Sequence, residues 1–205
     1  MKKRKYSAIV FDLGNVLIPF DYSVMLNKLD AVKAGLGKKF WEYYKNNYSI
    51  HRTFERGGIT NEEFIRMMLD SCENSLDSTT FCKYYSEIFT IDEDVVSLLP
   101  IIKQKGYKLF LLSNTNEIHR EYGYKDYEFL KYFDKLFLSH RVGAVKPEPE
   151  IYKSVEKYSG FPPEEHIFID DIADYAEGAK NTGWDAIHFK DYNRLLKELK
   201  LKGIL

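Results

Sequence analysis

Polar side chains stand at or just beyond the ends of apolar runs in this 205-residue chain, and their types suit one kind of chemistry. They are Asp12, Ser113, Asn114, Lys146 and the pair Asp170–Asp171. Three carboxylates in close quarters repel one another, and a hard cation such as Mg²⁺ relieves that repulsion. A hydroxyl and an ammonium beside such a cation can hold the oxygens of an anion. Together these groups indicate phosphoryl transfer, in which a protein mainly positions groups and neutralises charge.

The elements that must position these side chains are short strands. Apolar runs that end at polar or turn-forming residues occupy residues 7–11, 108–112, 135–138 and 166–169, with a weaker run at 186–189. Helical patterns lie between them, for example at 151–158 and 173–181. Continuous apolar runs alternating with helices predict βα units around a parallel sheet that is buried on both faces. Because ligands bind beyond the carboxyl ends of such strands, we expect the polar residues to meet at one edge.

One interval is too long for a single βα unit. The ninety residues 18–107 lie between the first two strand-like runs, whereas a whole βαβ unit takes roughly 30. Most of the interval has helical patterning: Thr60–Glu63 forms a capping box, and residues 92–105 have the pattern of a helix that returns to the second strand. We therefore expect a Rossmann-like α/β core at residues 1–19 and 93–205, with an all-helical cap at 20–92 inserted after strand one.

The composition limits the classes to which the protein can belong. Hydrophobic residues make up 44% of the chain, enough for a sizeable core, and 30 Lys and Arg almost cancel 31 Asp and Glu. A nucleic-acid groove or a polybasic membrane contact needs a strong positive field, so we expect neither partner. The chain has two cysteines, and the apolar stretch after its basic N-terminus is too short for a signal peptide. We expect a cytoplasmic protein that is a monomer or a homodimer.

Four ordered motifs make the chain resemble the haloacid dehalogenase-like (HAD) hydrolases. The matching segments are Phe11–Leu17, Leu112–Asn116, Val145–Tyr152, and Ile169–Asp171 with Glu177–Ala179. The helical insert is similar to that family's type-1 cap, and the Asp-Leu-Gly-Asn run of the first motif resembles that of small sugar-phosphate phosphatases. The resemblance implies a Mg²⁺-dependent phosphatase that hydrolyses a small phosphorylated metabolite through an aspartyl-phosphate.

The resemblance also implies a role for each matching residue. Asp12 would attack phosphorus, and Lys146 would pair with both that carboxylate and the phosphate. Ser113 and the backbone amide of Asn114 would hold phosphate oxygens. The Mg²⁺ ligands would be Asp12, the backbone carbonyl of Gly14, Asp171, and Asp170 directly or through water.

Gly14 and Tyr175 depart from the pattern of that family. Its phosphatases usually have a second Asp two residues after the nucleophile, as general acid for the leaving group, and Gly14 cannot move a proton. Many relatives have Asp or Asn at the position of Tyr175. Gly14 leaves open, as an alternative, a metal-binding regulatory or weakly active protein. A 2-haloacid dehalogenase is the other alternative, and Asp170–Asp171 disfavours it because the dehalogenases need no metal and lack the paired acids.

Other residues are candidates on less specific grounds. Arg52 and Arg56, in the helical insert, are candidates for substrate contact, against the plainer interpretation of a solvated surface. His166 begins a strand and is expected to be exposed. His119 is expected on a helix surface, with a position facing the cap as the alternative. If the leaving-group proton comes from a side chain, His51 in the cap and His119 are the first candidates.

Overall fold

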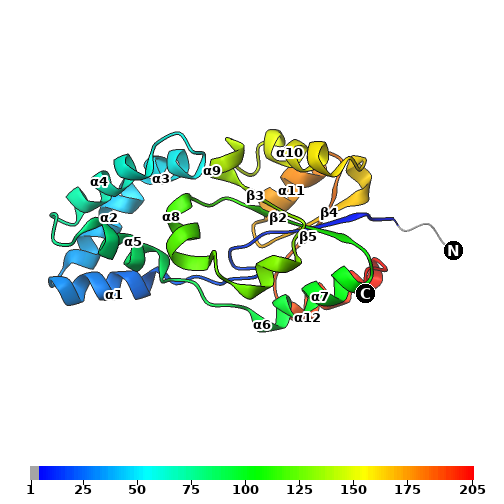
Figure 1. Cartoon of the computed structure of the whole chain (residues 1–205), viewed down its shortest axis with the longest axis horizontal. Helices are drawn as coiled ribbons and strands as arrows, with labels where there is room; N and C mark the ends of the chain where they lie inside the picture. Colours follow the sequence, from blue (N-terminus) through cyan, green and yellow to red (C-terminus); the bar gives the residue numbers. More distant parts are fainter. Residues whose placement is uncertain (1–4) are drawn as a thin grey trace.

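A five-stranded parallel sheet lies at the centre of the protein, whose computed structural model describes residues 5–205 (Figure 1). The strands are β1 (Ala8–Phe11), β2 (Lys108–Ser113), β3 (Lys135–Leu138), β4 (His166–Asp170) and β5 (Asp185–His188), in the order β3-β2-β1-β4-β5. Every pairing is parallel, and Val10 of β1 aligns with Phe110 of β2 and Phe168 of β4. Both β1 and β4 are buried throughout, which confirms the α/β fold class predicted from their continuous apolar runs.

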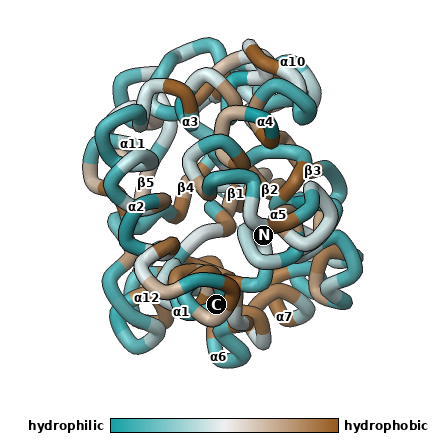
Figure 2. The backbone as a smooth tube through the Cα atoms, turned by 90° about the vertical axis from the view of Figure 1, so that its left-hand side faces the viewer, coloured by the Kyte–Doolittle hydropathy of each residue, from teal (hydrophilic) through white to brown (hydrophobic). Residues whose placement is uncertain are grey.

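Helices cover both faces of this sheet, and Figure 2 shows the strands side by side between them. One face packs against α6 (Glu93–Val96), α7 (Leu98–Gln104) and α12 (Tyr192–Leu201). The other face packs against α10 (Pro149–Ser159) and α11 (Ala173–Asn181). Successive side chains of a strand point to opposite faces, so Ile9 joins the first core and Val10 the second.

A group of helices lies beyond the carboxyl ends of the strands (Figure 1). It consists of α1 (Tyr22–Val32), α2 (Leu36–Asn46), α3 (Tyr48–Glu55), α4 (Asn61–Ser71) and α5 (Ser78–Ser86). These helices bury their own hydrophobic cluster, and the expected capping box, Thr60 with Glu63, opens α4. Two segments connect these helices to the sheet, and they run antiparallel and side by side at Phe20 and Phe89. Asp21 N–H donates to Ile88 O at 2.9 Å between them. The inserted helical cap is therefore a compact unit with paired connections.

The segment that returns to the sheet differs from its prediction. We expected one helix over residues 92–105, and the structure has α6 and α7, which meet at Ser97. Asp92 caps α6 by accepting a hydrogen bond from Val95 N–H at 3.0 Å. Pro100 has no N–H to donate to the carbonyl four residues earlier, which interrupts the hydrogen-bond ladder of a single helix.

His166 is buried rather than exposed, which corrects a second expectation. Its ring stacks on Trp184 with the centroids 4.7 Å apart, and its nitrogens contact Ser159 Oγ and the Pro162 carbonyl at 2.9 and 3.0 Å.

The remaining helical segments are α8 (Glu117–His119), α9 (Ser139–Val142), a π turn at Arg120–Tyr124 and 3₁₀ turns at Glu128–Tyr132 and Pro163–Glu165. Within residues 5–205, no helix has the length and apolar character needed to cross a membrane.

Candidate active site

The carboxyl ends of β1 and β4 bring three aspartates together. Asp12 follows β1, and its N–H donates to Ile169 O of the neighbouring β4 at 2.9 Å. Asp170 ends β4 and Asp171 follows it. Ligand oxygens from these three side chains all lie within 4.8 Å of one another. The parallel pairing of two central strands therefore assembles the acidic cluster that the sequence predicted.

Lys146 bridges two of these acids from the loop before α10. Its Nζ lies 2.7 Å from Asp12 Oδ1 and 2.7 Å from Asp170 Oδ2, and the side chain is 1% exposed. The rings of Phe168 and Tyr175 flank the ammonium, with centroids 5.3 and 5.0 Å away. Buried charges are stable only when they are paired, and this lysine gives the two acids a shared partner.

Burial and repulsion set the electrostatics of the cluster. Burial raises the pKa of Asp12 to about 8, although Lys146 acts in the opposite direction. Burial lowers the pKa of Lys146, but Asp12 and Asp170 outweigh it and the pKa lies above its ordinary value. Burial and the neighbouring Asp170 raise the pKa of Asp171. A second positive charge at this edge would therefore stabilise the ionised acids.

The donor set at this edge fits a hard divalent cation. Its side-chain donors are carboxylate oxygens, which Mg²⁺ prefers. Both oxygens of Asp170 are engaged, since Oδ1 accepts from Ile172 N–H at 2.8 Å and Oδ2 from Lys146. Within the described residues, the Asp171 carboxylate has one hydrogen bond, a 3.2 Å contact donated by Asn15 Nδ2. The carboxylates of Asp12 and Asp171 thus have fewer protein partners than that of Asp170. They are the ones that line the pocket.

Ser113 and Asn114 follow at the end of β2 and face the acids. Asn114 holds the backbone of Lys146 on both sides, since its Oδ1 accepts from Lys146 N–H at 2.8 Å and its Nδ2 donates to Lys146 O at 3.2 Å. The family resemblance implied anion binding by the Asn114 backbone, and it did not predict the contact of the Asn114 side chain with Lys146. The Ser113 hydroxyl makes one contact, a 3.4 Å hydrogen bond to Asn114 O, and is otherwise open to the pocket.

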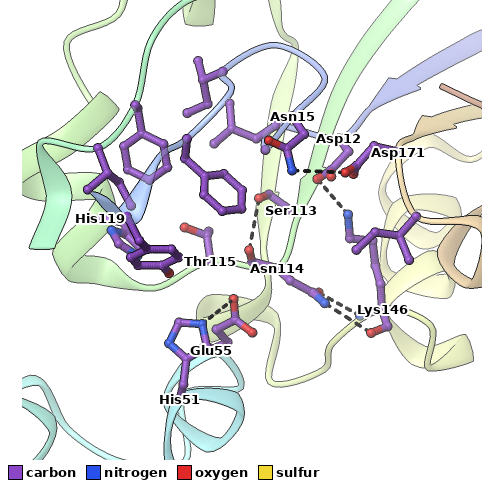
Figure 3. Close-up of a pocket in the computed structure, with 18 of the residues that line it drawn as sticks. Asp12, Asn15, His51, Glu55, Ser113, Asn114, Thr115, His119, Lys146 and Asp171 are labelled. Carbon is purple, nitrogen blue, oxygen red and sulfur yellow. Dashed lines mark hydrogen bonds and ion pairs between the residues drawn. The ribbon is translucent and has the colours of Figure 1, made fainter. Parts of the chain in front are cut away.

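A cavity of about 360 Å³ lies between the sheet edge and the cap (Figure 3). Of the predicted site residues, its wall contains Asp12, Gly14, Arg52, Ser113, Asn114, Lys146 and Asp171. Asp170 is fully buried behind Lys146 and does not reach the cavity. Arg56 also stays outside, because it forms an ion pair with Glu148 at the surface. The structure thus brings Arg52 to the pocket and places Arg56 elsewhere.

The cap side of the cavity is aromatic and carries groups that the sequence did not single out as substrate contacts. Its aromatic wall consists of Phe20, Tyr22, Trp41, Tyr44, Tyr48 and Phe89. His119 is 5% exposed and stacks on Tyr85 at 4.2 Å, so it faces the cap rather than a helix surface. Glu55, which the sequence analysis did not name, also lines the pocket. Its spacing of four residues from His51 and three from Arg52 places all three on one side of a helix, a signal that was available.

Comparison with known proteins agrees with this site. The sequence model of the haloacid dehalogenase-like hydrolase family matches residues 6–183. Over 190 residues the chain is 28% identical to D-ribitol-5-phosphate phosphatase of Bacteroides thetaiotaomicron, covering 86% of this chain and 88% of that protein. It is 24% identical to the phosphorylated carbohydrates phosphatase of Thermotoga maritima, with 88% and 83% covered.

A solved structure extends the likeness to three dimensions. It is a HAD family enzyme from Bacteroides thetaiotaomicron in complex with magnesium and inorganic phosphate. The two folds match with a TM-score of 0.75 and 26% identity, covering 93% of this chain and 98% of the other. The family match includes every residue that converges on the acidic edge of the pocket. The chain belongs to the haloacid dehalogenase-like hydrolases.

Proposed function

We propose that this hydrolase is a Mg²⁺-dependent phosphatase that acts on a small sugar or sugar-alcohol phosphate through an aspartyl-phosphate intermediate. The observation that carries the proposal is the buried Asp12–Lys146 contact inside a three-aspartate cluster at the edge of a pocket. A nucleophile, a fixed cation and a set of hard oxygen ligands are the parts that phosphoryl transfer needs. The two curated relatives named above act on phosphorylated sugars or sugar alcohols, which supports the substrate class.

The proposed chemistry has two displacement steps at phosphorus. An oxygen of Asp12 attacks phosphorus, and the bond to the ester oxygen breaks, with its electron pair leaving on that oxygen. Water then attacks phosphorus in the aspartyl-phosphate and releases inorganic phosphate and the Asp12 carboxylate. Lys146 orients the Asp12 carboxylate through Oδ1, and its charge reduces repulsion between the carboxylate and the phosphate. The Ser113 hydroxyl and the Asn114 N–H are the proposed donors to phosphate oxygens.

Asp12 and Asp171, with the Gly14 carbonyl, are the proposed Mg²⁺ ligands, and Asp170 orients Lys146 beside them. When bound, Mg²⁺ supplies positive charge that offsets repulsion among the acids and the phosphate. The paired acids Asp170–Asp171 also favour phosphorus over carbon chemistry, because a metal-free dehalogenation would leave three acids with Lys146 as the cation that they share.

The helices at residues 20–92 are proposed to act as the cap that closes the pocket, over a core of residues 1–19 and 93–205. A cavity of about 360 Å³ suits a small phosphorylated metabolite. Both cysteines, Cys72 and Cys82, are buried and unpaired, which fits a reducing compartment, and we propose a cytoplasmic location.

The alternative of a weakly active or regulatory protein rests on Gly14, which supplies no general acid.

A phosphate-release assay tests the proposal. Purified protein with Mg²⁺ is expected to release phosphate from phenyl phosphate and from sugar-alcohol phosphates, and excess chelator is expected to abolish the release. Asp12→Asn keeps the shape of the side chain but removes the attacking charge, so its rate should fall by orders of magnitude. Full turnover in chelator, or no turnover on any phosphoester, would contradict the proposed function.

A further inference from the structure

Glu55 is distinct from the other acids of the pocket. The carboxylates that line the cavity, among the described residues, are Asp12, Asp171 and Glu55. The first two belong to the cluster at the sheet edge, whereas Glu55 is the last residue of α3 in the cap. Figure 3 shows its carboxylate above the His51 ring and facing Asn114 and Thr115 of the core. Glu55 is therefore placed where the part of a substrate beyond its phosphate would lie.

Two neighbours on α3 hold this carboxylate in its ionised form. Arg52 Nη1 lies 2.8 Å from Oε2, and His51 Nε2 lies 3.3 Å from Oε1. Burial raises the pKa of Glu55, but His51 and Arg52 outweigh it, and the pKa lies below its ordinary value. The other charged groups that line the pocket are Lys45 and, at the sheet edge, Asp171 with the Asp12–Lys146 pair. Glu55 is thus a fixed anion with fixed orientation.

Tyr85 fixes which nitrogen of His51 carries the proton. Burial holds the pKa of Tyr85 well above its ordinary value, so its hydroxyl stays protonated. That hydroxyl lies 3.0 Å from His51 Nδ1, and because the Glu55 carboxylate can only accept from Nε2, Nδ1 of a neutral His51 accepts from Tyr85. In the neutral ring Nε2 then carries the hydrogen and donates to Glu55. The result is a chain of hydrogen bonds, Tyr85 to His51 to Glu55, that points into the pocket.

Glu55 keeps spare capacity to accept hydrogen bonds. An ionised carboxylate has about four acceptor sites, and each oxygen of Glu55 has one side-chain partner in the structure. The residue is 7% exposed, so bulk water has little access and the free sites face the cavity. The stacked rings of Trp41 and Tyr44, 5.6 Å apart, form an apolar wall of the same cavity. Acceptor sites beside an aromatic wall suit a molecule with hydroxyls on an aliphatic carbon chain.

We propose that Glu55 is a specificity-determining residue that accepts hydrogen bonds from hydroxyl groups of the leaving group, so that the pocket selects polyhydroxylated phosphoesters over unsubstituted alkyl phosphoesters. The inference rests on the proposed phosphatase function and adds a residue and a chemical criterion to it. His51 and Arg52 are positioning residues, since each makes one contact that orients the Glu55 carboxylate.

The test compares two substrates that share chain length and ester type. A five-carbon sugar alcohol 5-phosphate and n-pentyl phosphate are both primary alkyl esters and differ in their hydroxyl groups. Wild type is expected to prefer the hydroxylated ester in kcat/KM by about tenfold or more, because a hydrogen bond to a charged group contributes about 1.5–3 kcal/mol. Glu55→Gln is expected to reduce that preference by about 10- to 100-fold, mainly through KM on the hydroxylated ester.

The preference is a ratio measured on one sample, so a partly misfolded variant does not change it. Glu87→Gln is the matched control, because Glu87 pairs with Lys28 on the cap surface and lies outside the pocket; its preference should equal that of wild type. Equal rates on the two esters in wild type, or an unchanged preference in Glu55→Gln, would overturn the inference and leave the phosphatase proposal intact. Failure of wild type on both esters and on phenyl phosphate would instead remove the proposed function.

Discussion

At the residue scale, Lys146 is the group that lets Asp12 and Asp170 coexist in the interior. The three side chains are at most 8% exposed, and the ammonium lies 2.7 Å from an oxygen of each acid. Removing one partner from such a buried set leaves uncompensated charge, which costs far more than an exposed pair contributes. Asn114 adds to the arrangement by holding the Lys146 backbone from both sides. The Asp12 carboxylate, the proposed nucleophile, is thus held in one orientation by protein groups alone.

Lys146→Met should both destabilise and inactivate the protein. The free energy of unfolding is expected to fall by about 3 kcal/mol, because two acids are left without their shared cation. Urea unfolding measures this change. The control Lys180→Met removes an exposed partner of Glu177 and should shift stability by less than about 0.5 kcal/mol. Equal stability of the two variants would contradict the paired-charge account.

Asp171→Ala should abolish Mg²⁺ binding, since Asp171 and Asp12 are the acids with the freer oxygens. Calorimetric titration with Mg²⁺ measures the binding directly, without substrate. Asp174→Ala removes a nearby acid that does not line the pocket, so its Mg²⁺ affinity should match that of wild type. Binding retained by Asp171→Ala and lost in Asp174→Ala would reverse the ligand assignment.

Gly14 predicts sensitivity to the leaving group. Positioned acids typically supply 10²–10⁴-fold, and a glycine at this position supplies none. In a series of substituted phenyl phosphates, the rate of the chemical step should fall steeply as the pKa of the leaving phenol rises. Gly14→Asp should flatten the slope, provided that Phe20, 3.3 Å from the new Cβ, moves by a few tenths of an ångström. A flat slope in wild type would mean that another residue donates the proton, with His51 and His119 the first to test.

At the scale of elements, α3 is a helix of the cap that contacts the core beside the acidic edge of the sheet. Arg52 Nη2 donates to Lys146 O at 3.2 Å, and Ser139 Oγ donates to the backbone carbonyl of Glu55. Just after this helix, Gly57 has φ +77°, and a Cβ there would lie 2.4 Å from His140 O of the core. The contact between cap and core therefore depends on the absence of a side chain at residue 57.

Gly57→Ala should weaken catalysis more than its backbone strain alone explains. The new methyl group would push α3 away from the core, so we expect kcat/KM to fall by about tenfold through displacement of Arg52 and Glu55. Gly35→Ala is the matched control, because Gly35 is also in the cap, has φ +82° and has nothing within 4 Å of the added Cβ. Steady-state kinetics of both variants at equal folded concentration make the comparison. Equal losses of kcat/KM in Gly57→Ala and Gly35→Ala would show that the close approach of residue 57 to His140 O does not cause the loss.

The elements divide into those that the sequence could predict and those that it could not. The strands and their polar ends were predicted, because a parallel strand buried on both faces is a continuous apolar run. The burial of His119 was not, since it arises from Tyr85 of the cap, which lies 34 residues earlier in the chain. The position of Glu55 in the pocket likewise depends on how α3 docks on Ser139. Packing between the cap and the core joins residues far apart in the chain, so the hydrophobic periodicity of the sequence does not reveal it.

At the scale of the whole molecule, Asp185 ties the first described residues to the last helix. Its Oδ2 accepts hydrogen bonds from Lys202 at 2.8 Å, from Lys5 at 3.2 Å and from the Tyr6 hydroxyl. Burial raises the pKa of Asp185, but these donors outweigh it and the pKa lies well below its ordinary value. Asp185 is the first residue of the edge strand β5, so these contacts hold that strand to residues 5–6 and to Lys202.

Asp185→Asn should destabilise the protein in a pH-dependent manner. A carboxyl whose pKa is depressed by folding stabilises the native state above its unfolded pKa of about 3.9, and this contribution is lost as the pH falls. The difference in unfolding free energy between wild type and variant is expected to be about 1 kcal/mol at neutral pH and to shrink below about pH 4. Urea unfolding across this range measures it. A difference that grows on acidification would contradict the assigned sign.

The proposed two-step mechanism requires a covalent bond between phosphate and Asp12. Wild-type protein turning over phenyl phosphate with Mg²⁺ is quenched in acid, which preserves an acyl phosphate, and its peptides are analysed by mass spectrometry. The account predicts one added phosphate on the peptide that contains Asp12, and none in Asp12→Asn. Phosphate on a peptide containing Ser113, or turnover with no phosphorylated peptide at any quench time, would contradict it.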